Sequence, residues 1–213
     1  MNYTDFSAKA QRDDKSTNDK IHFFSSYFSS PVAFSLYKLG FTPNGITFLF
    51  LIVGLSSSVS LYLNFPLLCY ILWRLHIILD MSDGNLARAT SNFSKSAIGF
   101  DRSNHIVINT TLLLVSAKSV ENIFLVSFLV ITFYLYYFFG RNYYSGKTKT
   151  REFSLIKNFF KNILSLEGYI ILTCLLVLLG LQTFQPLIIL FYGLNFLALY
   201  FYKLRLFFVD TSP

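Results

Sequence analysis

Six long runs of apolar residues, separated by short polar segments, dominate this chain of 213 residues. Apolar side chains make up 54% of the residues and occur on every face of the runs, which is typical of helices that cross a lipid bilayer. A helix needs about 20 residues to cross roughly 30 Å of hydrocarbon, and each run approaches that length. The sequence therefore predicts an all-α integral membrane protein. Its six transmembrane helices are expected at residues 44–64, 66–88, 96–116, 121–140, 164–181 and 184–206.

The N-terminal segment differs from the rest because it begins with polar residues of mixed charge. Residues 21–38 then mix aromatic and aliphatic side chains with serines, which predicts an interfacial helix lying on the bilayer surface. The largest segment between predicted spans, 141–162, has only about 22 residues, too few for a soluble domain. We therefore expect one membrane domain over residues 1–213, composed of the N-terminal segment 1–43 and a six-span core at 44–206.

The formal net charge of +7 could indicate a nucleic-acid partner. With six spans, however, nearly all lysines and arginines fall on one side of the membrane, and Lys118 falls on the other. The positive-inside rule then places both termini in the cytoplasm, together with the segment that joins the second and third spans. The basic residues thus serve as orientation signals and as contacts for anionic lipids. We expect the lipid bilayer as a partner, and no nucleic acid.

Two aspartates, Asp80 and Asp83, interrupt the second apolar run. A carboxylate inside a hydrophobic helix is costly, so it marks a functional site unless an arginine of the same bundle pairs with it. At about 100° per residue, the two carboxylates fall roughly 60° apart, and Gly84 and Ala87 share their face. Two carboxylates can bind a hard divalent cation, the small residues let a ligand approach closely, and Arg88 can bind a phosphate. The segment therefore predicts a metal and phosphate site at the membrane edge.

A second pair of polar residues follows in the third apolar run. Asp101 and His105 are four residues apart, so they lie on one face of a helix, about one turn from each other, together with Ala97. If the second and third spans pack antiparallel, their cytoplasmic halves bring this pair next to Asp80 and Asp83. The carboxylates and the imidazole then form one cluster.

Three further residues inside the runs have simple interpretations. Cys69 and Cys174 lie within apolar segments, which predicts buried thiols and no disulfide. His76, four residues before Asp80, is on the same helical face. It either belongs to a polar core or donates a hydrogen bond to Asp80.

The aspartates and their neighbours resemble the signature of the CDP-alcohol phosphatidyltransferase family. That signature reads Asp-x-x-Asp-Gly-x-x-Ala-Arg, then eight residues and Gly, then three residues and Asp, and again three residues and Asp. Its first half matches at Asp80, Asp83, Gly84, Ala87 and Arg88. In the second half Asp101 matches the third aspartate, whereas Ala97 stands at the second glycine and His105 at the fourth aspartate.

A second resemblance lies at the start of the first predicted span. Residues 42–47 are similar to the Thr-Pro-Asn-x-x-Thr sequence with which the family's first span begins. This resemblance implies that Asn44 and Thr47 contribute to the nucleotide pocket, and capping of the first helix by Asn44 is the alternative. Together the two resemblances cover roughly residues 30–110.

The resemblance implies an enzyme of phospholipid biosynthesis. Such an enzyme transfers a phosphatidyl, or another substituted phosphoryl, group from a CDP-alcohol to a polar alcohol acceptor and releases CMP. CDP-diacylglycerol is the donor expected for a short member of the family, and two divalent cations, Mg²⁺ or Mn²⁺, are the expected cofactors. The protein would lie in a bacterial cell membrane with its active site facing the cytoplasm, as a monomer or a homodimer. The implied metal ligands are Asp80, Asp83, Asp101 and His105, and the implied nucleotide- and phosphate-binding residues are Asn44, Thr47, Gly84, Ala87 and Arg88.

His105 leaves three interpretations open, because here an imidazole replaces a carboxylate. It can be a metal ligand through a neutral ring nitrogen. It can be the base that takes the proton of the acceptor hydroxyl, since the pKa of an unperturbed imidazole is about 6.5, and Asp101 is the other candidate catalytic residue. It can also be a position that has lost its function. In each case the site has one negative charge fewer than the family pattern, so one of the two cations is expected to bind more weakly.

Other functions are also compatible with these residues. The same chemistry could act on a non-phospholipid acceptor such as a surface glycan. A non-catalytic membrane scaffold could have inherited the fold. A transporter is less favoured, because the sequence shows no pair of interrupted hydrophobic segments.

Overall fold

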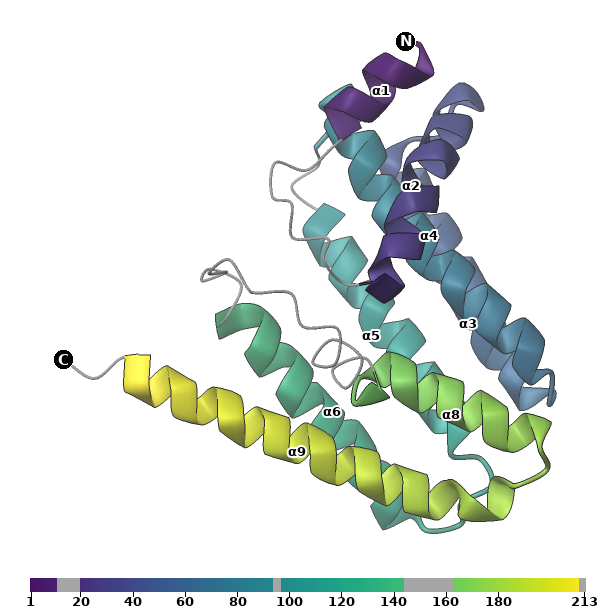
Figure 1. Cartoon of the computed structure of the whole chain (residues 1–213), viewed down its shortest axis with the longest axis vertical. Helices are drawn as coiled ribbons and strands as arrows, with labels where there is room; N and C mark the ends of the chain where they lie inside the picture. Colours follow the sequence, from purple (N-terminus) through teal and green to yellow (C-terminus); the bar gives the residue numbers. More distant parts are fainter. Residues whose placement is uncertain (11–19, 94–96, 144–162, 211–213) are drawn as a thin grey trace. The chain divides into compact units, whose positions relative to one another are not determined.

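The computed structural model describes residues 1–10, 20–93, 97–143 and 163–210. Within these ranges the chain is all-α, as the sequence predicts, with eight α-helices and one short 3-10 helix (Figure 1). Two segments, Pro43–Tyr62 and Gln182–Arg205, are long and apolar enough to cross a membrane. The elements are α1 (Tyr3–Ala10), α2 (Lys20–Lys38), α3 (Pro43–Tyr62), α4 (Pro66–Thr90), α5 (Ala97–Ser116), α6 (Ile123–Tyr143), α8 (Leu166–Leu178), η1 (Gln182–Phe184) and α9 (Gln185–Asp210).

The six predicted spans coincide with α3, α4, α5, α6, α8 and α9, and their ends differ by a few residues at most. Helix α8 is shorter than the predicted span 164–181 and has 13 residues. At 1.5 Å per residue this helix rises about 20 Å, less than the roughly 30 Å of hydrocarbon. Gly180 ends it in the left-handed region, at a φ of +69°, and the Leu181 amide donates to the Leu176 carbonyl at 2.8 Å. Residues 144–162 of the predicted cytoplasmic segment lie outside the described ranges.

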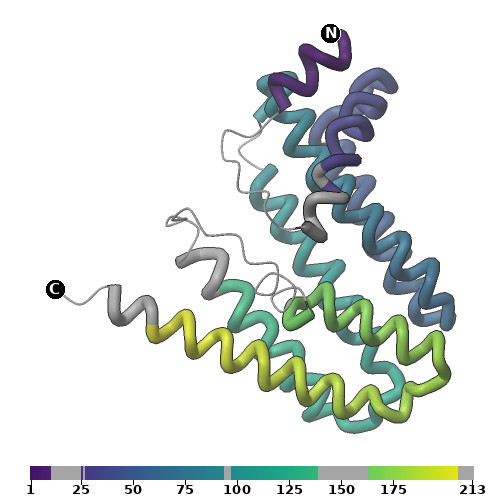
Figure 2. Tube along the Cα trace, in the orientation of Figure 1, coloured from purple at the N-terminus to yellow at the C-terminus, as the bar shows by residue number. Residues whose placement is uncertain are grey.

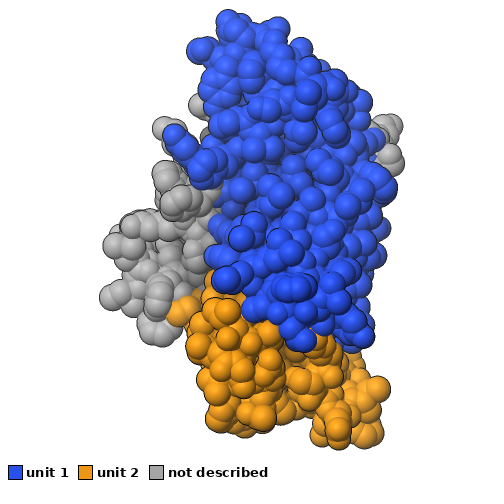
Figure 3. Space-filling model, turned by 90° about the vertical axis from the view of Figure 1, so that its right-hand side faces the viewer, with its two compact units in different colours: residues 1–115 blue, residues 116–213 orange. Residues whose placement is uncertain are grey.

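The described residues form two compact units, residues 1–115 and residues 116–213, which Figure 3 shows in different colours. The first unit contains α1 to α4 and α5 as far as Val115, and the second contains Ser116, the last residue of α5, and α6 to α9. That the two form one membrane domain stays a prediction.

Helix α4 is central to the first unit, because α1, α2 and α3 all pack against it. The chain reverses direction between α3 and α4 in a turn at residues 63–65, where Asn64 has a φ of +62° (Figure 2). Both helices begin at a proline, whose fixed φ suits the first helical position and whose missing amide hydrogen is not needed there. Polar contacts fix α2 on α4: the Ser82 hydroxyl donates to the Ser29 carbonyl at 3.0 Å, and the Asn85 amide donates to the Ser29 hydroxyl at 2.9 Å.

Helix α1 is absent from the sequence-based prediction, which describes the start of the chain only as polar and of mixed charge. The Asn2 side-chain oxygen accepts a hydrogen bond from the Asp5 amide at 2.8 Å, as a helix cap does. Phe6 is fully buried and its ring packs edge-on against Phe34 of α2, with 5.4 Å between centroids. The first ten residues are therefore part of the folded first unit. The helix predicted at 21–38 is confirmed as α2, and its position on a bilayer surface stays a prediction.

Helix α5 runs parallel to α3 within the first unit. The Asn104 side chain donates to the Thr47 carbonyl at 3.2 Å, and one turn or more further along both helices Gly54 meets Ile108. A Cβ atom at position 54 would lie 2.5 Å from Cδ1, 2.8 Å from Cγ1 and 3.0 Å from Cγ2 of Ile108. The absence of a side chain at Gly54 thus sets how closely these two helices approach.

This contact leads to a stability prediction. Gly54→Ala should lower the free energy of unfolding by about 1–3 kcal/mol, the usual cost of overpacking, because the fully buried Ile108 must shift to admit the new methyl group. Denaturation of the detergent-solubilised protein, followed by circular dichroism, measures the change. Ile108→Val, which removes the atom nearest to the new methyl group, should recover part of the loss in the Gly54→Ala background.

Gly99 on α5 provides the matched control, because nothing lies within 4 Å of a Cβ added there. Gly99→Ala should leave stability unchanged or raise it by up to about 1 kcal/mol, since alanine loses less backbone entropy than glycine on forming a helix. Equal destabilisation by the two alanine substitutions would contradict the proposed contact.

In the second unit α6 and α9 pack side by side along an aromatic seam. Phe196 of α9 lies against Phe133 and Tyr136 of α6, with ring centroids 5.4 and 5.8 Å apart. A buried polar cluster fixes α8 in this unit: the hydroxyl of Tyr169 lies 2.7 Å from the Ser116 hydroxyl and accepts from the Gln185 amide at 3.3 Å. These polar side chains satisfy one another, so the cluster has a structural role.

Candidate metal centre

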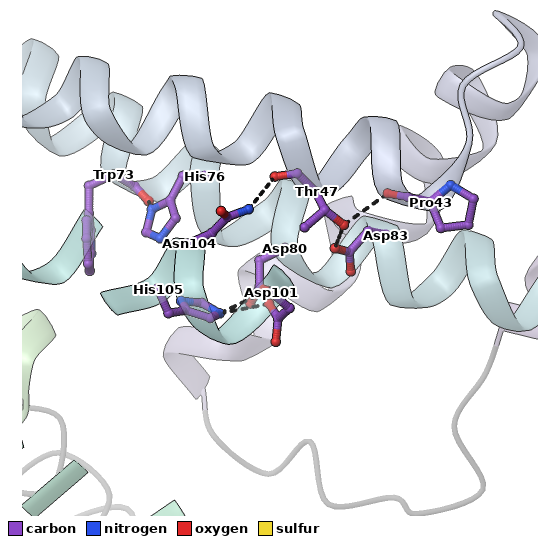
Figure 4. Close-up of polar contacts among 9 residues, drawn as sticks. All are labelled: Pro43, Thr47, Trp73, His76, Asp80, Asp83, Asp101, Asn104 and His105. Atoms are coloured by element: carbon purple, nitrogen blue, oxygen red, sulfur yellow. Dashed lines mark hydrogen bonds and ion pairs between the residues drawn. The ribbon is translucent and has the colours of Figure 1, made fainter. Parts of the chain in front are cut away.

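Three side chains converge between α4 and α5. Asp80 comes from α4, and Asp101 and His105 come from successive turns of α5 (Figure 4). The Nε2 atom of His105 lies 3.2 Å from Oδ1 of Asp80 and 3.3 Å from Oδ1 of Asp101. One ligand atom from each residue lies within 4.8 Å of the other two. The structure thus brings together three of the four residues expected to bind metal.

The position of His105 is set by its neighbours on α3. The Phe50 ring packs against the imidazole, with 5.5 Å between centroids and 34° between planes. The residue before it, Asn104, is buried and donates to the Thr47 carbonyl. These two contacts fix the rotation of α5 about its axis, so that Asp101 and His105 face α4.

Asp83, the fourth expected metal ligand, lies outside this group of three. Its Oδ2 atom accepts a hydrogen bond of 2.6 Å from the Thr47 hydroxyl, which also lies 3.0 Å from the Pro43 carbonyl (Figure 4). Asp83 therefore faces α3, whereas Asp80 faces α5. The carboxylates of the motif are divided between two neighbouring helices.

The donor set of the group fits a divalent cation. Two carboxylate oxygens and one imidazole nitrogen are ligands that Mn²⁺ and other first-row dications accept. The side chains are partly accessible, with exposed fractions of 30% for Asp80, 25% for Asp101 and 19% for His105. Further ligands, such as water or a phosphate oxygen, can therefore reach the same position.

Arg88, the expected phosphate ligand, makes hydrogen bonds within the chain. Its Nε atom donates to the carbonyl of Ala10, at the end of α1, at 2.9 Å, and its Nη2 atom donates to Oδ1 of Asn85 at 2.6 Å. A Cβ atom at Gly84 would lie only 3.3 Å from Nη1 of Arg88. The space that Gly84 leaves open thus lies beside the guanidinium group. Ala87 is half-buried, and its carbonyl accepts from Asn92 where α4 ends. The roles of Gly84, Ala87 and Arg88 in phosphate binding stay predictions.

The two residues expected at the nucleotide pocket have different environments. Asn44 is exposed in the first turn of α3, and Thr47 is buried against Asp83. Capping of the helix by Asn44 is wrong, because the cap is Thr42, whose hydroxyl accepts from the Gly45 amide at 3.2 Å. The side chain of Asn44 is therefore not needed to begin the helix.

His76 belongs to the buried core of α4. Its Nδ1 atom lies 2.6 Å from the Trp73 carbonyl, and because a carbonyl only accepts, Nδ1 carries the proton. The Nε2 atom of the neutral ring is then an acceptor and has no hydrogen to donate to Asp80. His76 is therefore a polar residue of the core with a structural role.

Two residues that support the centre were missed by the sequence analysis. Asn104 is three residues after Asp101, on the same helical face, so the periodicity of α5 could have identified it. Phe50 carries no such signal, since it is one aromatic residue among many in an apolar run. Cys69 and Cys174 are buried free thiols, as predicted.

A scan against protein-family models finds no match to this chain, and a search of curated proteins finds none either. The resemblance to the CDP-alcohol phosphatidyltransferases rests on the motif residues themselves.

Proposed function

We propose that this protein is a metal-dependent transferase of the CDP-alcohol phosphatidyltransferase type. It moves a phosphatidyl or other substituted phosphoryl group from a CDP-alcohol, CDP-diacylglycerol in the first instance, to a hydroxyl acceptor. The observation that carries the proposal is the convergence of Asp80, Asp101 and His105, at the spacing of the signature, from two different helices. Helical periodicity alone can bring Asp101 and His105 together, because both lie on α5. Asp80 lies on α4, so it meets them only because of how α4 and α5 are placed relative to each other.

The proposed setting is a six-span bundle in a bacterial cell membrane, with α2 on the bilayer surface and both termini in the cytoplasm. Two helical segments long and apolar enough to cross a membrane support it, as does the agreement of the other four helices with apolar runs. The positive-inside rule places the metal centre at the cytoplasmic face. There it can receive a soluble acceptor and a donor whose lipid tails stay in the bilayer.

The reaction replaces one phosphorus–oxygen bond by another. The acceptor hydroxyl oxygen forms a bond to the phosphorus that carries the alcohol, the bond from this phosphorus to the bridging oxygen breaks, and CMP leaves with that oxygen. Bound divalent cations supply neutralisation of the pyrophosphate charge. Asp80, Asp101 and His105 would hold a cation, and Asp83, oriented by Thr47, lies next along α4 to share in this role. The proton of the acceptor passes to a side chain of this cluster.

The test is CMP release by the purified protein from CDP-diacylglycerol, screened over a panel of acceptors that includes glycerol phosphate, inositol, inositol phosphate and serine. We expect release that depends on one acceptor and on Mg²⁺ or Mn²⁺, and that stops in excess chelator. Full turnover in chelator would contradict the metal role. Absence of CMP release over the whole panel, with other CDP-alcohols included as donors, would contradict the proposed function.

A second candidate is a non-catalytic membrane scaffold. It is favoured by the contact of a single nitrogen, His105 Nε2, with both Asp80 and Asp101, because this contact can satisfy two carboxylates without a cation. In that case the wild-type protein releases no CMP, and His105→Asp could recover release if only this ligand has been lost.

A further inference from the structure

We propose that His105 is a metal ligand through Nε2 and makes this centre select first-row transition-metal dications, such as Mn²⁺, over Mg²⁺. The inference rests on the metal centre of the proposed function, and it decides between the roles left open for this residue.

The distances around Nε2 match those within a coordination sphere. An octahedral ion about 2.1 Å from each ligand holds neighbouring ligands about 3 Å apart. The Nε2 atom lies 3.2 Å from one carboxylate oxygen and 3.3 Å from the other, and all three ligand atoms fit within 4.8 Å. A cation can therefore be bound by all three with small movements of the side chains.

The orientation of the imidazole is fixed before any cation binds. Phe50, which is fully buried, packs against the ring and restricts its rotation. Nε2 faces both Asp80 and Asp101 in this orientation (Figure 4). The nitrogen is thus already directed at the position that the two carboxylates define.

The type of donor atom decides which cation is favoured. Mg²⁺ binds oxygen ligands almost exclusively and keeps several of its waters, so it gains little from an imidazole nitrogen. Mn²⁺ and later first-row dications gain more from a nitrogen ligand. Replacement of a carboxylate by a neutral ring weakens the attraction for every dication alike, so this charge difference does not itself produce the preference.

One consequence concerns the base. When its lone pair binds a cation, Nε2 cannot also accept the proton of the acceptor hydroxyl. The base is then one of the carboxylates of the cluster, and His105 is a ligand only.

The first test is pulsed EPR spectroscopy of the full-length wild-type protein loaded with Mn²⁺. We expect ¹⁴N modulation from a directly bound imidazole, replaced by ¹⁵N modulation when the protein is made with ¹⁵N-histidine. This measurement needs no substitution and so does not depend on whether a variant folds. Saturable Mn²⁺ binding without a nitrogen coupling, or no saturable binding, would overturn the inference.

The second test is competition between Mn²⁺ and Mg²⁺ for the wild type and for His105→Asp. The ratio of the Mg²⁺ to the Mn²⁺ dissociation constant should fall by about tenfold or more in the variant, within the range that changes to metal-site residues usually produce. The nitrogen coupling should disappear while Mn²⁺ still binds. His76→Gln is the matched control, because His76 is a buried histidine on the Trp73 carbonyl and should leave coupling and ratio unchanged.

These outcomes are separate from those of the CMP assay. Mn²⁺ binding with a nitrogen coupling, but without CMP release from any donor, would support His105 as a metal ligand and contradict the proposed transferase function. CMP release with Mn²⁺, but without a nitrogen coupling, would support the transferase function and show that His105 does not bind the cation. If the ratio of the Mg²⁺ to the Mn²⁺ dissociation constant is unchanged in His105→Asp, His105 does not cause the proposed preference for Mn²⁺.

Discussion

Asp80→Asn and Asp101→Asn should each lower CMP release by at least about 100-fold, the loss usual when a charge-stabilising group is removed from an active site. Each substitution replaces a charged oxygen ligand by a neutral amide and so weakens cation binding as well. The protein should stay folded, because a buried amide costs less than a buried charge and can still contact His105. CMP release and Mn²⁺ titration, with circular dichroism as a check of folding, measure these effects.

Asp83→Asn should also abolish CMP release, with a different signature. Asp83 faces Thr47 and not His105, so the nitrogen coupling of bound Mn²⁺ should persist in this variant. Asp5→Asn is the control, since Asp5 is an exposed carboxylate on α1 and should have no effect on turnover. Near-wild-type turnover after substitution of any of the three motif aspartates would show that the cluster is misassigned.

Labelling from outside the cell should be all or none at two exposed lysine positions. With six spans and a cytoplasmic N-terminus, Lys118→Cys should react with a membrane-impermeant thiol reagent on intact cells, and Lys38→Cys only after permeabilisation. Lys38 is the last residue of α2 and Lys118 lies in a turn, and both side chains are exposed. The folded protein therefore does not shield either position from the reagent. The wild type is the control, because both native cysteines are buried. The reverse pattern would overturn the proposed orientation and the cytoplasmic position of the metal centre. Position 149, predicted to be cytoplasmic, lies outside the described residues and offers a second inside probe.

The helices could be predicted from sequence wherever hydropathy and turn chemistry agree. Pro43 and Pro66 mark two helix starts within a residue of the predicted positions, because proline is favoured there. At the end of α8 the two signals disagree. Hydropathy continues to Leu181, but Gly180 takes a left-handed conformation that ends the helix earlier. Helix α1 was missed because its few apolar residues matter only through contact with α2, which composition does not reveal.

The residues of the candidate site could be predicted from the sequence, but which of them lie together could not. Spacing in α5 shows that Asp101 and His105 share a face, and the structure agrees. Asp80 and Asp83 are only about 60° apart on a helix, so periodicity suggests one cluster. Because side chains of α4 contact residues of both α3 and α5, this small angle is enough to direct Asp83 to Thr47 on α3 and Asp80 to His105 on α5. Such a division depends on the rotation of α4, which tertiary contacts set.

If Arg88 binds a phosphate, as the sequence predicts, its hydrogen bond to the Ala10 carbonyl links helix α1 to ligand affinity. Nε and Nη2 form one edge of the guanidinium group, the edge that can hold two oxygens of a phosphate. Ala10 and Asn85 occupy those two donors, so a phosphate that binds there displaces the carbonyl end of α1. Docking of α1 and binding of an anion at this edge are then reciprocal: each weakens the other by the same factor. A bulky tag joined to Met1 would shift this equilibrium, so affinities for phosphate-bearing ligands are best measured on protein without such a tag.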